Sequence, residues 1–72
     1  MAVTLYVRDA CPYCEAIKRE LDERGVIYTE VNLSSAPAAL PELIKLTRGE
    51  RIVPVLVEGT TLSVAPSGGT RF

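Results

Sequence analysis

The stretch Cys11-Pro12-Tyr13-Cys14 lies where an apolar strand gives way to a helix. Residues 3–7, just before it, are apolar and β-branched in the manner of a strand covered on both sides. From Pro12 onward, apolar residues recur at the spacing of one helix face. Pro12 suits the first helical position because its φ is already helical and its missing N–H would be unpaired there. The stretch therefore predicts a strand–loop–helix unit with Cys11 at the helix N-cap.

The predicted N-cap position determines the chemistry expected of Cys11. Its sulfur would lie near free backbone N–H groups and the positive end of the helix dipole, which stabilises a thiolate by roughly 0.3–2 kcal/mol. We expect Cys11 to be partly exposed, with Arg8 as a second source of positive charge. Cys14, one turn further on, would be more shielded but able to attack a mixed disulfide on Cys11. The pattern predicts thiol–disulfide exchange, with Cys11 as nucleophile and Cys14 as resolving thiol. The alternative is a pair of inert buried cysteines, for which this spacing has no purpose.

Composition limits the function classes that this chain can belong to. Its 72 residues, 47% hydrophobic and 24% charged, indicate one small globular domain over residues 1–72. A net charge of −1 with mixed signs argues against nucleic-acid binding. No apolar run approaches the roughly 20 residues of a membrane span, and no secretory signal is recognised, so we expect a cytoplasmic protein without a membrane partner. Two cysteines and no histidine exclude a four-ligand zinc site in one chain, and no metal is expected.

The rest of the chain predicts the element order β-α-β-α-β-β. The expected elements are a strand at 3–7, a helix at 12–24, a strand at 26–33, a second helix that ends at Arg48, and strands at 54–57 and 61–64. The start signal of the second helix is Ser34-Ser35-Ala36-Pro37, with a hydroxyl cap and an early proline. Pro41 is expected to make the first turn of the second helix irregular, or to be the point where the regular helix begins. The Gly- and Pro-rich residues 65–72 are expected to form a flexible tail, with a backbone nest for an anion at Gly68-Gly69 as the alternative. A strand, a helix and a strand with a short return form a parallel βαβ unit. The sequence therefore predicts an α/β fold: a four-stranded mixed sheet with one helix on each face.

The Cys-Pro-Tyr-Cys motif after the first strand and Val53-Pro54 after the second helix resemble those of a glutaredoxin with the thioredoxin-like fold. The resemblance covers residues 2–64, and the ending Gly68-Gly69-Thr70 more specifically resembles short glutaredoxin-like proteins called the UXX-star family. In that family the first active-site position, here Cys11, can be selenocysteine. The resemblance implies a thiol–disulfide oxidoreductase without a resident cofactor. Its substrate would be a disulfide-containing protein or a glutathione mixed disulfide. Either glutathione, as co-substrate, or a reductase would restore the dithiol.

The resemblance also implies a set of substrate-binding residues around the motif. Arg8 stands where glutaredoxins usually carry a lysine that contacts glutathione, although a solvated charge is the alternative. Tyr13 would flank the bound thiol substrate, or be an ordinary exposed tyrosine, and Pro12 belongs to the same group. Pro54 is expected to be cis, which only an X–Pro bond makes inexpensive, and to present the Val53 backbone as an antiparallel edge. A trans proline opening an edge strand is the alternative.

The chain departs from ordinary glutaredoxins after Gly68-Gly69-Thr70. Those proteins continue with an acidic residue and a third helix, whereas here Arg71 and Phe72 follow. Part of the usual glutathione site is therefore missing, and one sheet face is expected to remain partly bare. An apolar patch of this kind often becomes an interface, which predicts a homodimer or a docked partner. The expected border of the patch is Leu56, Leu62 and Val64.

Two functions of other classes are alternatives to the enzyme. One is an iron–sulfur or metal carrier dimer with Cys11 from two chains and external thiols as ligands. The other is a non-catalytic thioredoxin-like interaction module that uses the bare sheet face. A visible absorption band in anaerobically purified protein would favour the carrier, and retained function in Cys11→Ser would favour the module.

Overall fold

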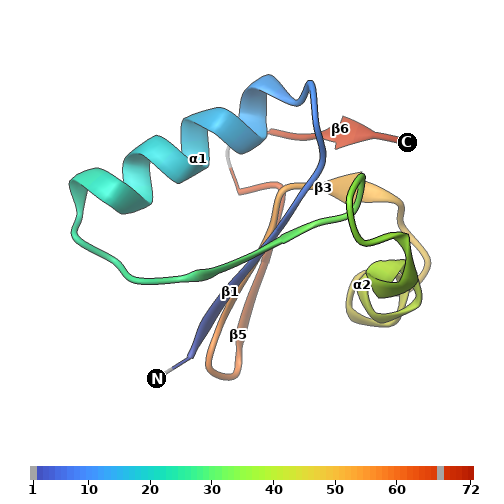
Figure 1. The fold of residues 1–72 in the computed structure, drawn as a ribbon. Helices are drawn as coiled ribbons and strands as arrows, with labels where there is room; N and C mark the ends of the chain where they lie inside the picture. Colours follow the sequence, from blue (N-terminus) through green and yellow to red (C-terminus); the bar gives the residue numbers. More distant parts are fainter. Residues whose placement is uncertain (1, 67) are drawn as a thin grey trace.

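The structure is a computed structural model that describes residues 2–66 and 68–72. Two α-helices pack on opposite sides of a four-stranded sheet, and a two-stranded sheet lies at one end (Figure 1). The elements are β1 (Val3–Val7), α1 (Pro12–Glu23), β2 (Thr29–Asn32), a 3-10 turn η1 (Pro37–Ala39), α2 (Leu40–Thr47), β3 (Ile52–Val53), β4 (Val55–Glu58), β5 (Thr61–Val64) and β6 (Thr70–Arg71). The predicted thioredoxin-like α/β fold is confirmed.

The four-stranded sheet has the order β2-β1-β4-β5. Strand β1 is parallel to β2 and antiparallel to β4, where Leu5 lies opposite Leu56 and Tyr6 opposite Val55. Successive side chains of a strand point to opposite faces. Leu56 lines a pocket with Leu21 of α1, so Leu5 and Leu56 face α1 while Tyr6 and Val55 face α2. All four are buried, and the core therefore lies on both sides of β1 and β4.

Helix α1 begins and ends close to the predicted bounds. It starts at Pro12, and Gly25 follows its C-cap with a φ of +70°, a conformation that favours glycine. Its buried face consists of Cys14, Ile17 and Leu21. The predicted strand at 26–33 is too long, since β2 covers only Thr29–Asn32. Residues 26–28 instead carry the chain from α1 to the sheet, with Ile27 91% exposed.

The hydroxyl cap predicted for the second helix is wrong. The Ser34 hydroxyl accepts the backbone N–H of Asp9 at 3.1 Å instead, and Ala36 precedes η1 without a side-chain cap. The predicted irregular start is confirmed, because the 3-10 turn comes before α2 and Pro41 lies in the first turn of α2. Proline is tolerated there because first-turn N–H groups have no partner within the helix.

The predicted strand at 54–57 is divided at Pro54. The Val53–Pro54 peptide is cis, as predicted, and separates β3 from β4. The predicted flexible tail is wrong in part, because Thr70–Arg71 forms β6 and pairs antiparallel with β3. Figure 1 shows β6 beside β3, below the start of α1. The last strand thus lies against the region of the two cysteines.

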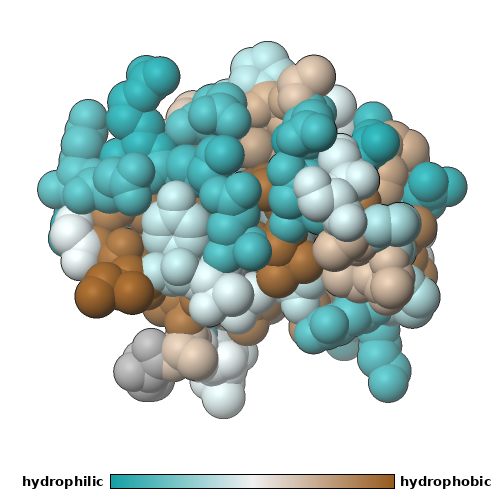
Figure 2. Space-filling view, in the orientation of Figure 1, coloured by the Kyte–Doolittle hydropathy of each residue, from teal (hydrophilic) through white to brown (hydrophobic). Residues whose placement is uncertain are grey.

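The register of the large sheet also changes the expected apolar patch. Leu62 lies opposite Val57 and Leu56 opposite Ser63, so Leu62 and Leu56 face opposite sides of the sheet. Leu56 is buried, whereas Leu62 is 42% exposed. In Figure 2 apolar surface is interrupted by polar residues, and hydrophilic side chains gather over α1. The homodimer stays a prediction, without the patch border on which it was based.

Candidate active site

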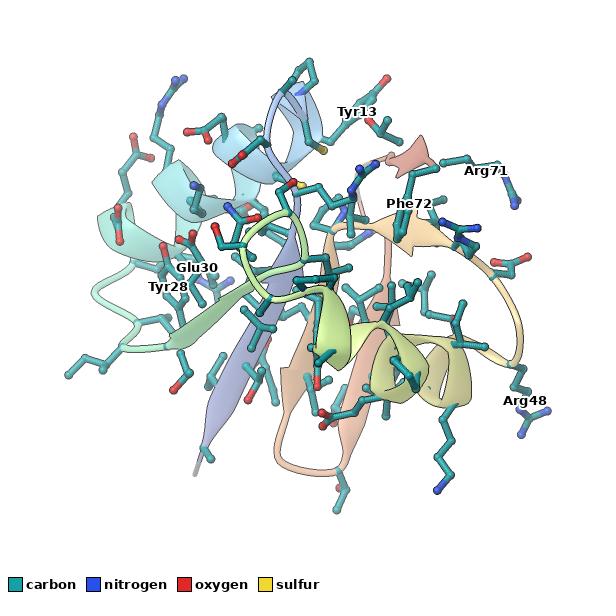
Figure 3. All side chains as sticks on the ribbon, turned by 45° about the vertical axis from the view of Figure 1, so that its right-hand side comes forward. Tyr13, Tyr28, Glu30, Arg48, Arg71 and Phe72 are labelled. Atoms are coloured by element: carbon teal, nitrogen blue, oxygen red, sulfur yellow. The ribbon has the colours of Figure 1, made fainter. Side chains whose placement is uncertain are left out.

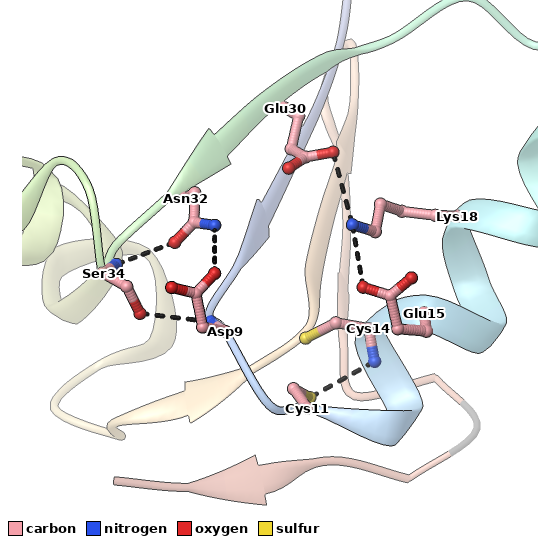
Figure 4. Close-up of polar contacts among 8 residues, drawn as sticks. All are labelled: Asp9, Cys11, Cys14, Glu15, Lys18, Glu30, Asn32 and Ser34. Carbon is pink, nitrogen blue, oxygen red and sulfur yellow. Dashed lines mark hydrogen bonds and ion pairs between the residues drawn. The ribbon is translucent and has the colours of Figure 1, made fainter.

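Cys11 is the N-cap residue of α1, as predicted. Its backbone is extended, with φ −110° and ψ 105°, and Pro12 occupies the first turn. The Cys11 Sγ accepts the backbone N–H of Cys14 at 3.2 Å (Figure 4). The sulfur therefore takes the role that a serine or aspartate oxygen has in an ordinary cap. A negative charge on it is favoured by the adjacent end of the helix dipole.

The predicted partial exposure of Cys11 is wrong. Cys11 is only 3% exposed and Cys14 is fully buried. Both are free cysteines. The Cys11 Sγ lies 3.5 Å from Thr70 Oγ1, across 59 residues of sequence. The strand after Gly69 thus covers a sulfur that the N-cap position alone would leave at the surface.

The two thiols differ in acidity. Burial alone raises the pKa of Cys11, but hydrogen bonds from the Cys14 side chain, Thr70 and the backbone N–H groups of Cys14 and Tyr13 outweigh it, so that its pKa is lowered. Burial, and then the hydrogen bond with Cys11, raise the pKa of Cys14 to about 12. Of the two, Cys11 is the thiol that ionises first.

The loop before Cys11 is fixed to the end of β2 by a polar network that the sequence does not reveal. The Asn32 side-chain amide donates to Asp9 Oδ1 at 2.9 Å and accepts the Ser34 N–H at 2.8 Å (Figure 4). Between this network and Cys11, Ala10 has a φ of +58°. Residues other than glycine adopt that region at a cost, so the surrounding contacts hold the loop in this conformation.

Positive charge near the cysteines is partly neutralised. The Lys18 ammonium lies 3.1 Å from Glu15 and 3.6 Å from Glu30 (Figure 4). The pair with Glu15 lies within α1, and the pair with Glu30 connects α1 to β2. Lys18 lowers the pKa of Cys14, but that effect is smaller than the effect of burial, which raises it.

The Val53 backbone, predicted to be a free edge for substrate, is paired within the chain. Val53 lies opposite Thr70 and Ile52 opposite Arg71 in the β3–β6 ladder. The Phe72 N–H extends the ladder by donating to the Arg51 carbonyl at 3.0 Å. Strand β6 therefore occupies the edge beside cis-Pro54 that the resemblance assigns to a substrate.

Tyr13 and Pro54 lie on a shallow apolar pocket beside the same strand. The pocket has a volume of about 290 Å³ and includes Ile17 and Gly68 in its lining. Tyr13 is 46% exposed. A Cβ at Gly68 would lie 2.8 Å from its Cε1 atom, so the segment passes close to the ring. Figure 3 shows Tyr13 at the start of α1, near β6.

Arg8 contacts the C-terminal segment. Its guanidinium carbon lies 4.4 Å from the centre of the Phe72 ring, and that of Arg51 lies 5.2 Å away. Such cation–π contacts contribute about 0.5–1 kcal/mol at exposed sites. Figure 3 shows Phe72 at the end of β6, with Arg71 directed away from it.

Sequence reasoning does not single out Thr70 or Phe72 as site residues. Both contacts depend on a long-range pairing, and the only local signal is a β-branched and an aromatic residue after two glycines. Among residues 2–66 and 68–72, no group of three or more His, Cys, Asp or Glu side chains could hold a metal ion. In the same part of the chain, no helix is long and apolar enough to cross a membrane.

Comparison with known proteins places this geometry in a family. A profile of the glutaredoxin family matches residues 3–62. The chain belongs to the glutaredoxin family. The glutaredoxin-like protein NrdH of Escherichia coli K12 is 34% identical over 59 residues, which is 82% of this chain and 70% of NrdH. Glutaredoxin 1 of Rickettsia felis is 36% identical over 53 residues, covering 72% of this chain and 52% of that protein.

A solved structure agrees with the family assignment of this glutaredoxin. The NrdH-redoxin of Escherichia coli, a glutaredoxin-like protein described as having a thioredoxin-like activity profile, superposes with a TM-score of 0.78 and 31% identity. The match covers 89% of this chain and 82% of the other. The protein is therefore a glutaredoxin-like thiol–disulfide oxidoreductase in the general sense.

Proposed function

We propose that this protein reduces disulfides of other proteins by a dithiol mechanism, with Cys11 as nucleophile and Cys14 as resolving thiol. One observation carries the proposal: the Cys11 Sγ caps α1 by accepting the Cys14 N–H at 3.2 Å. The lowered pKa of Cys11 adds support, because the thiolate is the form that attacks a disulfide. Arg8, Pro12 and Tyr13 would contact the substrate.

In the first step the Cys11 thiolate attacks one sulfur of the substrate disulfide. A Cys11–substrate disulfide forms, and the other substrate sulfur leaves as a thiolate that takes a proton from solvent. Val53 and the Pro54 ring would lie beside the new bond. The buried thiol of Cys14, one turn along α1, then lies next to this disulfide.

In the second step Cys14 attacks the Cys11 sulfur. The Cys11–Cys14 disulfide forms, and the substrate sulfur bound to Cys11 leaves as a thiolate and takes up the Cys14 proton. The charge of Cys11 is one cause of the high pKa of Cys14, which is about 12, and it is absent once Cys11 is in a neutral mixed disulfide. The substrate has then gained two electrons and two protons.

We propose a thioredoxin-reductase-type donor in preference to glutathione for restoring the dithiol. The relative NrdH-redoxin is described as having a thioredoxin-like activity profile. In this chain Gly68-Gly69-Thr70 is followed by Arg71 and not by an acid. An arginine there does not attract the ammonium group of the γ-glutamyl end of glutathione.

A reductant of the proposed class has to be present where the protein acts, which favours a reducing compartment. Disulfides form readily in secreted proteins and are rare in the cytosol. We propose that this glutaredoxin acts in the cytoplasm.

A pair of reduction assays tests the proposed function. Wild type, Cys14→Ser and Cys11→Ser are compared in the reduction of insulin disulfides and of a glutathione mixed disulfide. Each assay is coupled either to NADPH and thioredoxin reductase or to glutathione and glutathione reductase. We expect wild-type activity on insulin with thioredoxin reductase and its loss in both variants. Activity of Cys14→Ser equal to wild type on insulin, or turnover only with glutathione, contradicts the proposal.

A further inference from the structure

The segment Gly68–Phe72 contacts Cys11, the Val53 edge, Tyr13 and Arg8, four parts of the site that a substrate is expected to contact. Thr70 lies opposite Val53, and its hydroxyl is 3.5 Å from the Cys11 sulfur. The segment also touches two of the side chains assigned to substrate, Tyr13 through Gly68 and Arg8 through Phe72. A strand that served only to complete the fold would have no reason to contact all of them.

The geometry of the segment is that of an extended peptide bound at a sheet edge. It runs antiparallel to β3, and the Phe72 N–H donates to the Arg51 carbonyl at 3.0 Å. In binding of this kind the main-chain pairing provides affinity, and the side chains that fit the site provide specificity. The side chain at position 70 is the one beside the nucleophile, where a substrate would place its cysteine.

We propose that residues 68–72 act as an intramolecular pseudosubstrate, which covers Cys11 and must be displaced by an extended peptide of the partner protein. This inference rests on the proposed function and adds a regulation to it. Thr70 stands in for the substrate cysteine. Its hydroxyl hydrogen-bonds to the sulfur but cannot react with it, so the closed state keeps Cys11 ionisable and shielded at once.

The segment 68–72, called the cover below, can separate from the rest of the structure at low cost. Strand β6 has two residues, and of Thr70, Arg71 and Phe72 none is buried. Segments with few buried apolar contacts open at low free energy compared with the core. A partner that supplies the same main-chain pairing can therefore replace β6 while the four-stranded sheet stays intact.

The register also defines the substrate class that the edge accepts. A Cβ at Gly69 would lie 2.6 Å from the Val53 carbonyl oxygen, so this register favours glycine before the reacting cysteine. Phe72 lies against Arg8 and Arg51, so an aromatic residue fits two positions after the cysteine. The expected substrate is an extended segment of the form Gly-Cys-x-aromatic.

Gly69→Ala tests the cover with a single added methyl group. Its Cβ collides with the Val53 carbonyl oxygen, a backbone atom that cannot rotate away, so β6 separates from β3. The rate of Cys11 alkylation by iodoacetamide, located by peptide mass spectrometry, is compared on the high-pH plateau where the thiolate predominates. We expect a rise of about tenfold, as for release from a weakly closed segment. Gly25→Ala, strained at φ +70° but with no atom within 4 Å of the new Cβ, is the matched control and should not differ from wild type.

A peptide supplied from outside distinguishes a pseudosubstrate from a purely structural strand. The synthetic hexapeptide Ser-Gly-Gly-Thr-Arg-Phe should slow alkylation of Gly69→Ala in a saturable manner, while Ser-Gly-Gly-Phe-Arg-Thr should not. Wild type should respond to neither, because its own segment is present at high effective concentration. An unchanged alkylation rate in a folded Gly69→Ala would contradict the claim that residues 68–72 shield Cys11. Equal effects of the two peptides would contradict the claim that these residues imitate a substrate.

The substrate class has its own measurement. Gly69→Ala should reduce the glutathione mixed disulfide of Gly-Gly-Cys-Arg-Phe about tenfold faster than that of Gly-Gly-Cys-Phe-Arg, and equal rates overturn the assigned class. Alkylation requires no disulfide exchange. Fast alkylation of Gly69→Ala without any reduction of either peptide would support the shielding of Cys11 by residues 68–72 and reject the proposed function.

Discussion

The two sheets of this glutaredoxin contrast in what holds them together. The four-stranded sheet has Leu5 and Val55 fully buried at its centre. The two-stranded sheet has four residues, of which only Val53 is buried. Beside this sheet, Phe72 packs partly buried against the edge of the core and against two arginines, and the Arg71 guanidinium lies 3.7 Å from the Glu50 carboxylate.

This difference assigns the stability of the fold to the large sheet and the access of substrate to Cys11 to the small one. The large sheet and α1 place the Cys11 sulfur at a helix N-terminus, whereas the small sheet determines what reaches that sulfur. Changes in β1 or β4 should therefore lower the free energy of unfolding. Changes in β6 should alter the reactivity of Cys11 and leave the fold in place.

The largest effect is expected from Cys11→Ser. A serine hydroxyl can cap α1 but is a far weaker nucleophile toward a disulfide than a thiolate, so insulin reduction should fall about a thousandfold or more. The measurement is insulin reduction together with a chemical denaturation curve. A retained activity would contradict the role of Cys11 as nucleophile. An unfolded variant would contradict the claim that the site contributes to activity and the large sheet to stability.

The contrast between the sheets is tested directly by Leu5→Ala and Phe72→Ala. Leu5 lies in the centre of the large sheet, and its truncation should lower the free energy of unfolding by about 2–5 kcal/mol. Loss of the Phe72 ring, which follows β6 and is only partly buried, should lower this free energy by less, about 1–2 kcal/mol. Urea denaturation followed by circular dichroism measures both. Equal losses would show that β6 is part of the core.

Thr70→Val removes the hydroxyl from β6 and keeps the shape of the side chain. The Thr70 hydrogen bond is one of the contacts that lower the pKa of Cys11, so that pKa should rise. Less thiolate is then present near neutral pH, and alkylation there should slow by about fivefold, as for the loss of one hydrogen bond. The pH profile of alkylation should shift to higher pH, and Thr70→Ser should restore it. A shift to lower pH would contradict the assigned role of the hydroxyl.

The smallest effect is expected at Ala10, in the loop that leads into Cys11. Its φ of +58° is strained for alanine and not for glycine. Ala10→Gly should therefore change the free energy of unfolding by no more than about 1 kcal/mol, in the stabilising direction. Thermal unfolding checks this, with Ala38→Gly in η1, where no such strain exists, as the destabilising control. A loss of stability at both positions would mean that the loop is not strained.

The parts of the structure that follow from local sequence could be predicted. The apolar pattern of residues 3–7 and the Pro12 start signal gave β1 and α1 nearly to the residue. The cis peptide at Pro54 came from the family resemblance and is confirmed. These features depend on short-range preferences or on a motif within a few residues.

The features that depend on distant pairing could not be predicted. Ser34 looks like a helix cap, but its hydroxyl accepts the N–H of Asp9, 25 residues earlier in the chain. Residues 65–72 have the glycines and proline of a tail, and β6 forms only because β3 offers a free edge. The burial of Cys11 follows from the same pairing. Local patterns located the nucleophile but did not reveal what covers it.

The position of Phe72 has a practical consequence. The chain contains no tryptophan, and the ring at position 72 lies 4.4 Å from the guanidinium of Arg8. An indole placed there by Phe72→Trp would be the sole fluorophore of its kind, and its emission would change whenever the ring left the two guanidinium groups. Stopped-flow fluorescence, excited where the three tyrosines hardly absorb, would then time each departure and return of residues 70–72.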